Sequence, residues 1–333
     1  MNLKAGILGG GSWGTTVASL TARNAPVKIW ARDASTVVEI NTHRSNKKYL
    51  PGARLHSELV ATHSIEETVA GADVLVMGIP SQHFRAVLQL ARPHIRPWVP
   101  VISLTKGLEL DTGMRMTEII NEELPGHPVG VLTGPNLARE IIAGQAAASV
   151  IAMEDEIIVR ELQALFSCGL FRVYTNDDLI GCELGGVLKN IIAIAVGMGD
   201  GQGTGDNTRS ALITRGLAEI SRLGEAMGGR PETFAGLAGM GDLIATCVSP
   251  QSRNRHVGFE LGKNRSIEEI IDEMVMVAEG VKSAPVVVAL GEKYEIEMPI
   301  SRDVLSVIQG EKTARQAFRG LLKSDAGAES EPG

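Results

Sequence analysis

Short apolar runs alternate with helical patterns over the first half of the chain. Residues 3–8 form a short apolar run that ends in glycines, which predicts a buried parallel strand, and residues 15–24 follow with helical character. Together with a second strand at 27–30 they predict one βαβ unit. Further strands are predicted at 73–79, 99–104, 130–133, 148–153 and 172–175, and a short helix at 138–143.

The pattern changes after Asn176. Strand-like runs almost vanish, and helical stretches follow at 178–198, 207–228, 231–237, 254–263, 266–276, 280–293, 299–309 and 313–322. Strands alternating with helices, followed by helices alone, predict fold class α/β, with a Rossmann-type, mostly parallel sheet domain at 1–176 and an all-α C-terminal domain at 177–323. The small, polar and acidic segment 324–333 is predicted to be a disordered tail.

Composition narrows the class of partner. The 333 residues fit about two domains, and the formal net charge of -7 argues against nucleic acid, whose phosphates demand a basic surface. Three widely separated cysteines without metal-ligand spacing predict reduced thiols and no metal. The start shows no signal-peptide pattern, and charged side chains interrupt the longest apolar stretch, 180–198. We therefore expect a soluble, cytoplasmic protein that does not insert into membranes.

A glycine-rich turn at 9–14 follows the first strand. Gly9 permits the tight turn, Gly11 lets a pyrophosphate approach the backbone, and Gly14 lets the next helix pack closely on the strand. The free N–H groups at the start of that helix then face the phosphates. Glycine turns also occur for structural reasons alone, but the strand before this one and the helix after it favour a dinucleotide site.

The residue that follows the second strand reads the adenosine ribose. An acidic residue there selects NAD, whereas an arginine accommodates the 2′-phosphate of NADP. This chain carries Arg32 followed by Asp33, so both signals are present. Because the arginine comes first we expect the use of NADP, with NAD also accepted. The alternative is that Arg32 is an ordinary solvated cation.

Lys189 interrupts an otherwise apolar helix. It is expected to lie over Gly185 and Gly186, where the missing side chains would leave open space for a substrate. Burial disfavours a charged ammonium, which makes a buried lysine a usable general acid or base near neutral pH. The alternatives are a lysine that reaches solvent, or one that pairs with Glu183, although that residue lies off the same helical face.

Other polar residues gather in predicted loops. Lys106 lies just past the carboxyl end of a strand, where ligands bind in open α/β sheets, and 134–138 follow the next strand at the same edge. Asp242, flanked by glycines, orients a hydroxyl or an amine, or else caps a helix. The stretch 252–256 brings together a hydroxyl, two guanidiniums and an amide, which suits a phosphate or carboxylate unless it is a solvated basic patch.

Together these segments resemble the bacterial NAD(P)-dependent glycerol-3-phosphate dehydrogenases. The shared motifs occur in family order between residues 3 and 322. They are Gly9-Gly10-Gly11-Ser12-Trp13-Gly14, Thr105-Lys106-Gly107, Gly134-Pro135, Leu184-Gly185-Gly186-Val187-Leu188-Lys189-Asn190, Thr214-Arg215-Gly216, Gly241-Asp242 and Gln251-Ser252-Arg253-Asn254.

The resemblance implies hydride transfer between nicotinamide C4 and C2 of a small phosphate substrate, at a site between the two domains. The reaction interconverts dihydroxyacetone phosphate and sn-glycerol 3-phosphate, which supplies glycerophospholipid synthesis. Lys189 matches the family's proton acceptor during alcohol oxidation. The positions that match substrate-binding residues are Lys106, Gly134, Asn136, Lys189, Asp242, Ser252, Arg253 and Asn254. Those that match cofactor-binding residues are Ser12, Trp13, Arg32, Lys106, Ala138, Arg253, Val277 and Glu279.

One position departs from the family, and two other functions fit parts of the sequence. Many members carry Ser or Thr where this chain has Asn136, whose reach and donor pattern differ. Other Rossmann dehydrogenases with helical domains, such as 2-ketoacid or hydroxyacyl reductases, lack a Ser-Arg-Asn loop in this context. A nucleotide-sensing module without catalysis needs no buried proton carrier such as Lys189. We expect the phosphate-specific dehydrogenase, and its apolar helices favour a homodimer.

Overall fold

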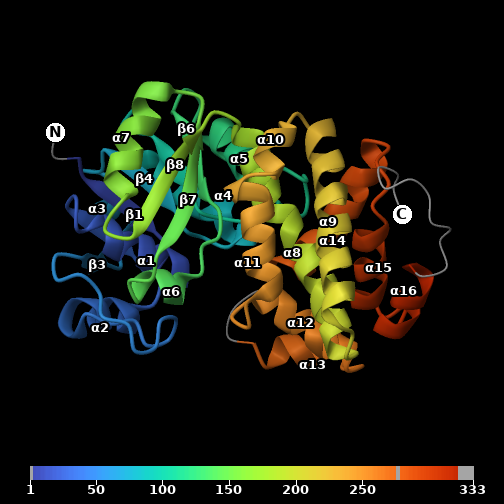
Figure 1. Ribbon diagram of the computed structural model, residues 1–333. Coiled ribbons are helices and arrows are strands. Elements are labelled where there is room, and N and C mark those ends of the chain that lie inside the picture. Colours follow the sequence, from blue (N-terminus) through green and yellow to red (C-terminus); the bar gives the residue numbers. More distant parts are fainter. Residues whose placement is uncertain (1–2, 275–277, 322–333) are drawn as a thin grey trace. The chain divides into compact units, whose positions relative to one another are not determined.

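The structure is a computed structural model that describes residues 3–274 and 278–321 (Figure 1). It divides into two compact units, one of Met1–Glu109 with Met114–Leu179 and one of Leu110–Gly113 with Ile180–Gly333. Within the described residues, every strand belongs to the first unit. Two predictions, the cofactor contact of Val277 and the disordered tail at 324–333, lie outside the described residues.

The first unit is built on one eight-stranded sheet in the order β3-β2-β1-β4-β5-β6-β7-β8. The strands are β1 (Ala5–Leu8), β2 (Val27–Trp30), β3 (Val60–Thr62), β4 (Val74–Met77), β5 (Val101–Ser103), β6 (Val129–Thr133), β7 (Ala147–Met153) and β8 (Phe171–Asn176). Neighbours are parallel except for β6 and β7. The strand order reverses at β1 and β4, and ligands of open α/β sheets bind outside the carboxyl ends of strands at such a point. The Rossmann-type prediction is confirmed.

The burial of each strand follows its place in the sheet. Central β1 and β4 are buried at every position, as expected of parallel strands that are covered on both faces. Edge strand β8 alternates, with Phe171 and Val173 buried and Arg172 and Tyr174 exposed. Its alternation means that only one of its faces packs on the core.

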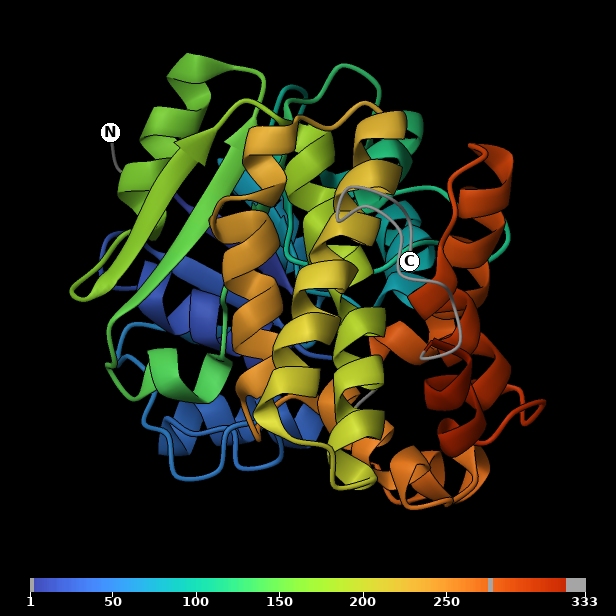
Figure 2. The ribbon, with the colours of Figure 1, turned by 45° about the vertical axis from the view of Figure 1, so that its right-hand side comes forward.

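Helices cover both faces of this sheet (Figures 1 and 2). They are α1 (Ser12–Thr21), α2 (Ala34–His43), α3 (Ile65–Val69), α4 (Ser81–Ala91), α5 (Met116–Glu123), α6 (Ala138–Ile142) and α7 (Glu156–Phe166). One core cluster joins Val17 of α1 and Leu162 of α7, and a second joins Phe84 of α4 and Ile119 of α5. Each face of the sheet therefore has its own core. Truncation of a fully buried phenylalanine such as Phe84 to alanine lowers the free energy of unfolding by about 3–5 kcal/mol.

The second unit is helical throughout its described part (Figure 2). Its helices are α8 (Leu179–Gly201), α9 (Asp206–Ala226), α10 (Pro231–Phe234), α11 (Asp242–Val248), α12 (Arg253–Gly262), α13 (Ile267–Asp272), α14 (Glu279–Lys293), α15 (Pro299–Ile308) and α16 (Ala314–Leu321), with a π turn at Leu237–Gly241. By length and composition α8 could cross a membrane, but 89% of its most apolar window is buried inside the protein. That burial is typical of the core helix of a soluble protein.

Where α8 meets α12 the two backbones lie almost in contact. A Cβ atom built on Gly197 would lie 2.1 Å from the carbonyl oxygen of Arg255, and one on Gly258 would lie 2.0 Å from that of Ile194. Near the end of α8, the carboxylate of Asp200 accepts a hydrogen bond of 2.8 Å from Arg255 Nε. Glycine packing and this ion pair together fix the first turn of α12 against α8.

The predicted strands agree with the observed ones to within two residues at either end, and 27–30 agrees at both ends. The hydrophobic pattern misses strand β3 and the helices α2, α3, α4, α5, α7 and α11. Only the middle residue of β3, Ala61, is buried, so this strand has no apolar run. Helix α11 follows the glycine-rich stretch 236–241, which is typical of a loop in sequence.

Candidate active site

The glycine turn after β1 lies at the point where the strand order reverses. Gly9 has a φ of +125°, a backbone conformation that favours glycine. A Cβ atom on Gly9 would lie 2.3 Å from the carbonyl oxygen of Gly78, which follows β4. One on Gly14 would lie 2.1 Å from the carbonyl oxygen of Gly9. The first and third glycines are therefore required by the packing of the chain itself.

The second glycine of the motif meets open space instead. Gly11 is the N-cap of α1, and a Cβ atom there would find nothing within 4 Å among the described residues. No side chain of the described chain caps the helix. Trp13 Nε1 is buried, again without a hydrogen-bond partner in the described part. An open backbone cradle at a helix N-terminus, beside an unsatisfied donor, fits the phosphates of a dinucleotide.

Asn46 lies outside this turn but contacts it, and no pattern in the sequence predicted this contact. It is fully buried, and its Nδ2 donates to the carbonyl oxygen of Gly10 at 2.9 Å and to Thr15 Oγ1 at 3.0 Å. The side chain therefore ties the glycine turn to α1. Asn46 stands in a polar stretch between Ser45 and Lys47, so no hydrophobic or motif pattern distinguishes it.

The two charged residues after β2 have different surroundings. The carboxylate of Asp33 caps α2 by accepting hydrogen bonds from the hydroxyl of Ser35 at 2.9 Å and from its backbone N–H at 3.0 Å, and these bonds lower the pKa of Asp33. Arg32 is exposed and makes no ion pair within the described part of the chain. The carboxylate is thus committed to its own helix, while the guanidinium is left for solvent or a ligand.

Two loops of the first unit meet after β5 and β6. Lys106 Nζ donates to the carbonyl oxygen of Gly134 at 2.9 Å, and Gly134 has a φ of +122°. Asn136 Oδ1 accepts a hydrogen bond from the hydroxyl of Ser149. Its Nδ2 is buried without a partner among the described residues. Ala138 begins α6 directly behind this loop. The structure therefore joins Lys106 to Gly134 and leaves the amide nitrogen of Asn136 as a donor.

Lys189 is buried in the second unit, 4% exposed. Its Nζ lies 2.9 Å from Asp242 Oδ1 and donates to the hydroxyl of Thr246. Asp242 is the first residue of α11, and Thr246 follows one turn later on the same helix. The lysine therefore neither reaches solvent nor pairs with Glu183, because Asp242 holds its ammonium. Thr246 is a member of this site that the sequence analysis missed, since α11 was not predicted.

The open space predicted beside Lys189 is filled at Gly185. A Cβ atom on Gly185 would lie 2.7 Å from the carbonyl oxygen of Ala238, in the π turn before α11. That prediction is wrong for Gly185, because the gap admits the chain's own backbone. The same glycine nonetheless serves the site, since it lets the π turn approach α8 and bring Asp242 to Lys189. Single π turns inside helices occur frequently at functional sites.

Cys247 lies next to Thr246 and is fully buried. Burial raises the pKa of its thiol to about 12, against the opposing charge of Lys189. A thiol with this pKa is protonated at neutral pH and is not a nucleophile. Cys247 is therefore no candidate nucleophile of this site.

The predicted Ser-Arg-Asn loop is the start of α12. Ser252 is its N-cap, and Ser252 Oγ accepts from the backbone N–H of Arg255 at 3.2 Å. The guanidinium of Arg255 lies 2.7 Å from Asp200. The two guanidiniums therefore do not act together as predicted, because that of Arg255 is bound to Asp200 and holds α12 to α8. Arg253 is exposed at the helix N-terminus, with Glu279 as its charged neighbour.

Asn254 connects three helices of the second unit. Its Oδ1 accepts from the backbone N–H of Gly280 at 3.0 Å, and its Nδ2 donates to Asn190 Oδ1 at 2.9 Å. A Cβ atom on Gly280 would lie 2.9 Å from the carbonyl oxygen of Asn190 and from Asn254 Oδ1. Glycine is therefore required at position 280, where α14 begins, and Glu279 is the first residue of this helix. Asn190 belongs to the shared motif at 184–190, but no role was predicted for it, although its position beside Lys189 was an available signal.

The sheet with its dinucleotide cradle, and the helical unit with its buried lysine–carboxylate pair, define a dinucleotide-dependent dehydrogenase. Comparison with known proteins narrows the class. The family model "NAD-dependent glycerol-3-phosphate dehydrogenase N-terminus" matches residues 4–159, and the corresponding C-terminus model matches residues 178–319. The chain belongs to the NAD-dependent glycerol-3-phosphate dehydrogenase family.

Individual relatives agree over the whole chain. A glycerol-3-phosphate dehydrogenase [NAD(P)+] of Sphingopyxis alaskensis is 72% identical over 333 residues, which is 100% of both chains. One of Mycobacterium bovis is 53% identical over 97% of this chain and 95% of its own. The crystal structure of glycerol-3-phosphate dehydrogenase from Coxiella burnetii has a TM-score of 0.93 at 36% identity, and covers 97% of this chain and 99% of that one. The resemblance stated from the motifs is confirmed.

Proposed function

We propose that the chain catalyses the reversible, NAD(P)-dependent reduction of dihydroxyacetone phosphate to sn-glycerol 3-phosphate, with Lys189 as the proton carrier. Its relatives carry the name of this activity over the full length of the chain. The single observation that supports the role of Lys189 is its ammonium, buried and held 2.9 Å from Asp242. The reduction of a ketone requires a proton donor near the carbonyl oxygen, and a fixed ammonium of this kind can serve as one.

The bound nicotinamide supplies or removes the hydride, and the chain handles the proton. Reduction builds negative charge on the ketone oxygen, and an ammonium stabilises that charge before it delivers a proton. Asp242 and Thr246 hold the ammonium of Lys189 from α11, so that it needs no reorientation during the reaction. In the oxidation of the alcohol, the same side chain accepts the proton.

The protein carries a net negative charge, so the phosphate group of the substrate needs a local cationic partner. Arg253 provides one at the N-terminus of α12, where free backbone N–H groups also favour an anion. Ser252 and Asn254 flank it, and Asn254 Nδ2 keeps one N–H beyond its bond to Asn190. From the first unit we propose contacts by Lys106, Gly134 and Asn136. The unsatisfied Nδ2 of Asn136 supports its part.

For the cofactor we propose that the turn formed by Gly9, Gly11 and Gly14 holds the pyrophosphate, with Ser12 and Trp13 in the first turn of α1. Arg32 is proposed to bind the 2′-phosphate of NADP, with NAD also accepted. The commitment of Asp33 to its own helix supports this preference. Further cofactor contacts proposed from the family pattern are those of Lys106, Ala138, Arg253 and Glu279.

The setting of the enzyme follows from the same proposal. We place it in the cytoplasm, as a homodimer that supplies sn-glycerol 3-phosphate for glycerophospholipid synthesis. The buried core helix α8 and three cysteines that form no disulfide in the described structure support a reducing, aqueous compartment. Analytical ultracentrifugation decides between a dimer and a monomer.

The test is NADPH and NADH oxidation by the purified chain with dihydroxyacetone phosphate, compared with dihydroxyacetone, which lacks the phosphate. We expect turnover only with the phosphorylated ketone. Lys189→Met is expected to abolish turnover while cofactor fluorescence still reports binding. Lys263→Met, at a half-exposed lysine of the same unit, is the matched control and should stay active. Absence of turnover in the unaltered protein with both cofactors would refute the proposal.

A further inference from the structure

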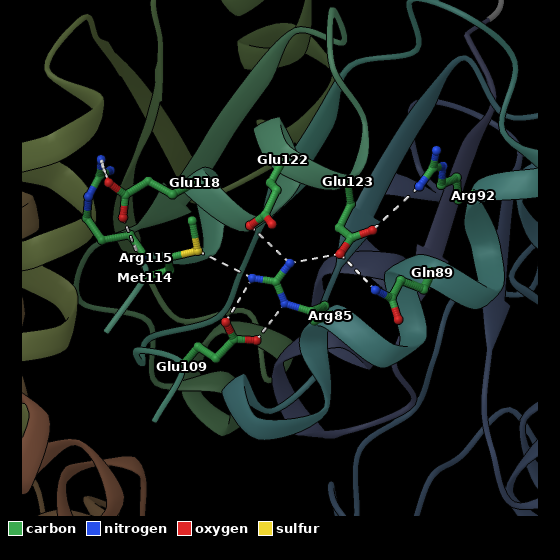
Figure 3. A network of polar contacts seen from close by, with 9 residues as sticks. All are labelled: Arg85, Gln89, Arg92, Glu109, Met114, Arg115, Glu118, Glu122 and Glu123. Carbon is green, nitrogen blue, oxygen red and sulfur yellow. Dashed lines mark hydrogen bonds and ion pairs between the residues drawn. The ribbon is translucent and has the colours of Figure 1, made fainter. Parts of the chain in front are cut away.

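Arg85 of α4 is the centre of a polar network, in which its guanidinium contacts three glutamates (Figure 3). Its guanidinium forms a two-pronged ion pair with Glu109, in which Nε and Nη2 each donate at 2.8 Å to one carboxylate oxygen. Nη1 donates to Glu123 at 2.8 Å and to Glu122 at 3.1 Å, both on α5. The remaining N–H points at the sulfur of Met114 at 3.3 Å. All five N–H donors of the guanidinium are used.

The network is more than a chance surface pair. The side chains of Arg85, Glu109 and Glu123 are 22%, 15% and 9% exposed. The hydrogen bonds that Arg85 donates to the glutamates, led by those to Glu109, raise the pKa of Arg85 above its ordinary value. Gln89 adds a hydrogen bond of 2.8 Å to Glu123. An arginine that holds several partly buried carboxylates in a fork geometry fixes the segments that carry them.

One of those segments carries Lys106. The loop after β5 is anchored before the lysine by Thr105, whose hydroxyl donates to the carbonyl oxygen of Ile79 at 2.6 Å. It is anchored after the lysine by α4, because Gln82 Nε2 donates to the carbonyl oxygen of Leu108 at 2.9 Å.

Arg85 holds the very next residue, Glu109, from the same face of α4, since Gln82 and Arg85 are three positions apart. Lys106 thus stands in a short span fixed at both ends, with its Nζ bonded to Gly134. A fixed span of this kind sets where a long, flexible lysine begins, and therefore where its ammonium can reach.

We propose that Arg85 and Glu109 form a positioning pair, which sets the place of Lys106 for the phosphate substrate. This inference rests on the proposed function, in which Lys106 contacts that substrate. Neither Arg85 nor Glu109 touches the reacting atoms in this account. Loss of the pair would let the loop after Lys106 move, and a misplacement of about 1 Å in a positioned group costs up to roughly a hundredfold in rate.

The first experiment compares variants within the network. Arg85→Gln and Glu109→Gln are each expected to raise the KM for dihydroxyacetone phosphate about tenfold or more, with a smaller change in kcat. Arg92→Gln is the matched control, because Arg92 is 60% exposed and only approaches Glu123, at 3.8 Å. It should leave the KM unchanged. If Arg85→Gln does not fold, Glu109→Gln carries the same comparison. A lower melting temperature with an unaltered KM in both variants would overturn the proposal.

The second experiment asks whether Arg85 acts through Lys106. In a Lys106→Gln background, Arg85→Gln should cause no further rise in KM, because the side chain that it positions is already gone. Independent, multiplying effects would overturn the positioning pair. The unaltered protein is measured in the same assay. Its failure to turn over dihydroxyacetone phosphate would count against the proposed function, whereas turnover with multiplying effects would count against the positioning pair alone.

Discussion

Replacement of Lys189 by methionine tests both the contribution of the buried ion pair to stability and its proposed part in catalysis. The side chains of Lys189 and Asp242 are 5% and 2% exposed, so the variant leaves a carboxylate buried without its cation. Breaking a buried pair in this way costs about 3–5 kcal/mol. Methionine fills much of the lysine volume and Thr246 remains beside the carboxylate, so we expect a loss of about 3 kcal/mol. A domain of ordinary stability, about 5–15 kcal/mol, would still fold.

The same variant is expected to lose more in the rate of catalysis than in stability. A positioned general acid contributes roughly 10²–10⁴-fold to the rate, and in the proposed mechanism the ammonium of Lys189 also stabilises the developing oxyanion. We therefore expect kcat to fall about 10³-fold or more, which corresponds to about 4 kcal/mol in the barrier. Chemical denaturation measures the first quantity, and stopped-flow or steady-state oxidation of NADPH measures the second.

A double variant distinguishes stability from chemistry. Lys189→Met with Asp242→Asn removes the unpaired charge, so most of the lost stability should return while turnover stays absent. A loss of less than about 1 kcal/mol in the free energy of unfolding of Lys189→Met would refute this prediction, since a buried, unpaired carboxylate destabilises the fold by more than that. Recovery of turnover in the double variant would equally refute Lys189 as the proton carrier.

Three further predictions test other parts of the structure. Arg32→Ala should raise the KM for NADPH roughly ten- to a hundredfold, as expected for a lost charged hydrogen bond, and barely change that for NADH; equal changes would make Arg32 a solvated cation. Gly280→Ala places a Cβ atom 2.9 Å from the carbonyl oxygen of Asn190 and should cost about 1–3 kcal/mol in denaturation, with a raised KM for the phosphate substrate. Burial alone would raise the pKa of Glu123, but the hydrogen bonds that it accepts, led by that from Arg85, lower this pKa below its ordinary value of 4.5. The ionised Glu123 therefore stabilises the fold above pH 4.5, and this stabilisation is lost as the pH falls below that value. Glu123→Gln should therefore be less stable than the unaltered protein at neutral pH, and the gap should close well below pH 4.5 in acid titrations of unfolding.

The parts of the fold that could be predicted are those with a local signal. Buried parallel strands read as continuous apolar runs, and the glycine spacing of 9–14 has a steric cause that the structure reproduces at Gly9 and Gly14. Strand β3 and helix α11 have no such signal. The first has one buried residue, and the second follows a π turn whose glycines resemble a loop.

Partners across the fold were harder to predict than residue identities. Lys189 stands out in sequence because a charge interrupts an apolar helix, but its partner Asp242 comes from a helix 53 positions further along the chain, and no periodicity connects them. Asn46 and Arg85 escaped notice for the same reason, since each acts through long-range hydrogen bonds. Gly185 was misread because a missing side chain signals space without saying whether a ligand or the backbone fills it.

The most direct test of the central claim follows the hydride itself. The unaltered protein is incubated with dihydroxyacetone phosphate and NADPH in which both hydrogens at nicotinamide C4 are replaced by deuterium, and the product is examined by NMR. The expected product is sn-glycerol 3-phosphate with one deuterium at C2 and none at C1 or C3. A product without deuterium, or with deuterium at another carbon, would contradict it.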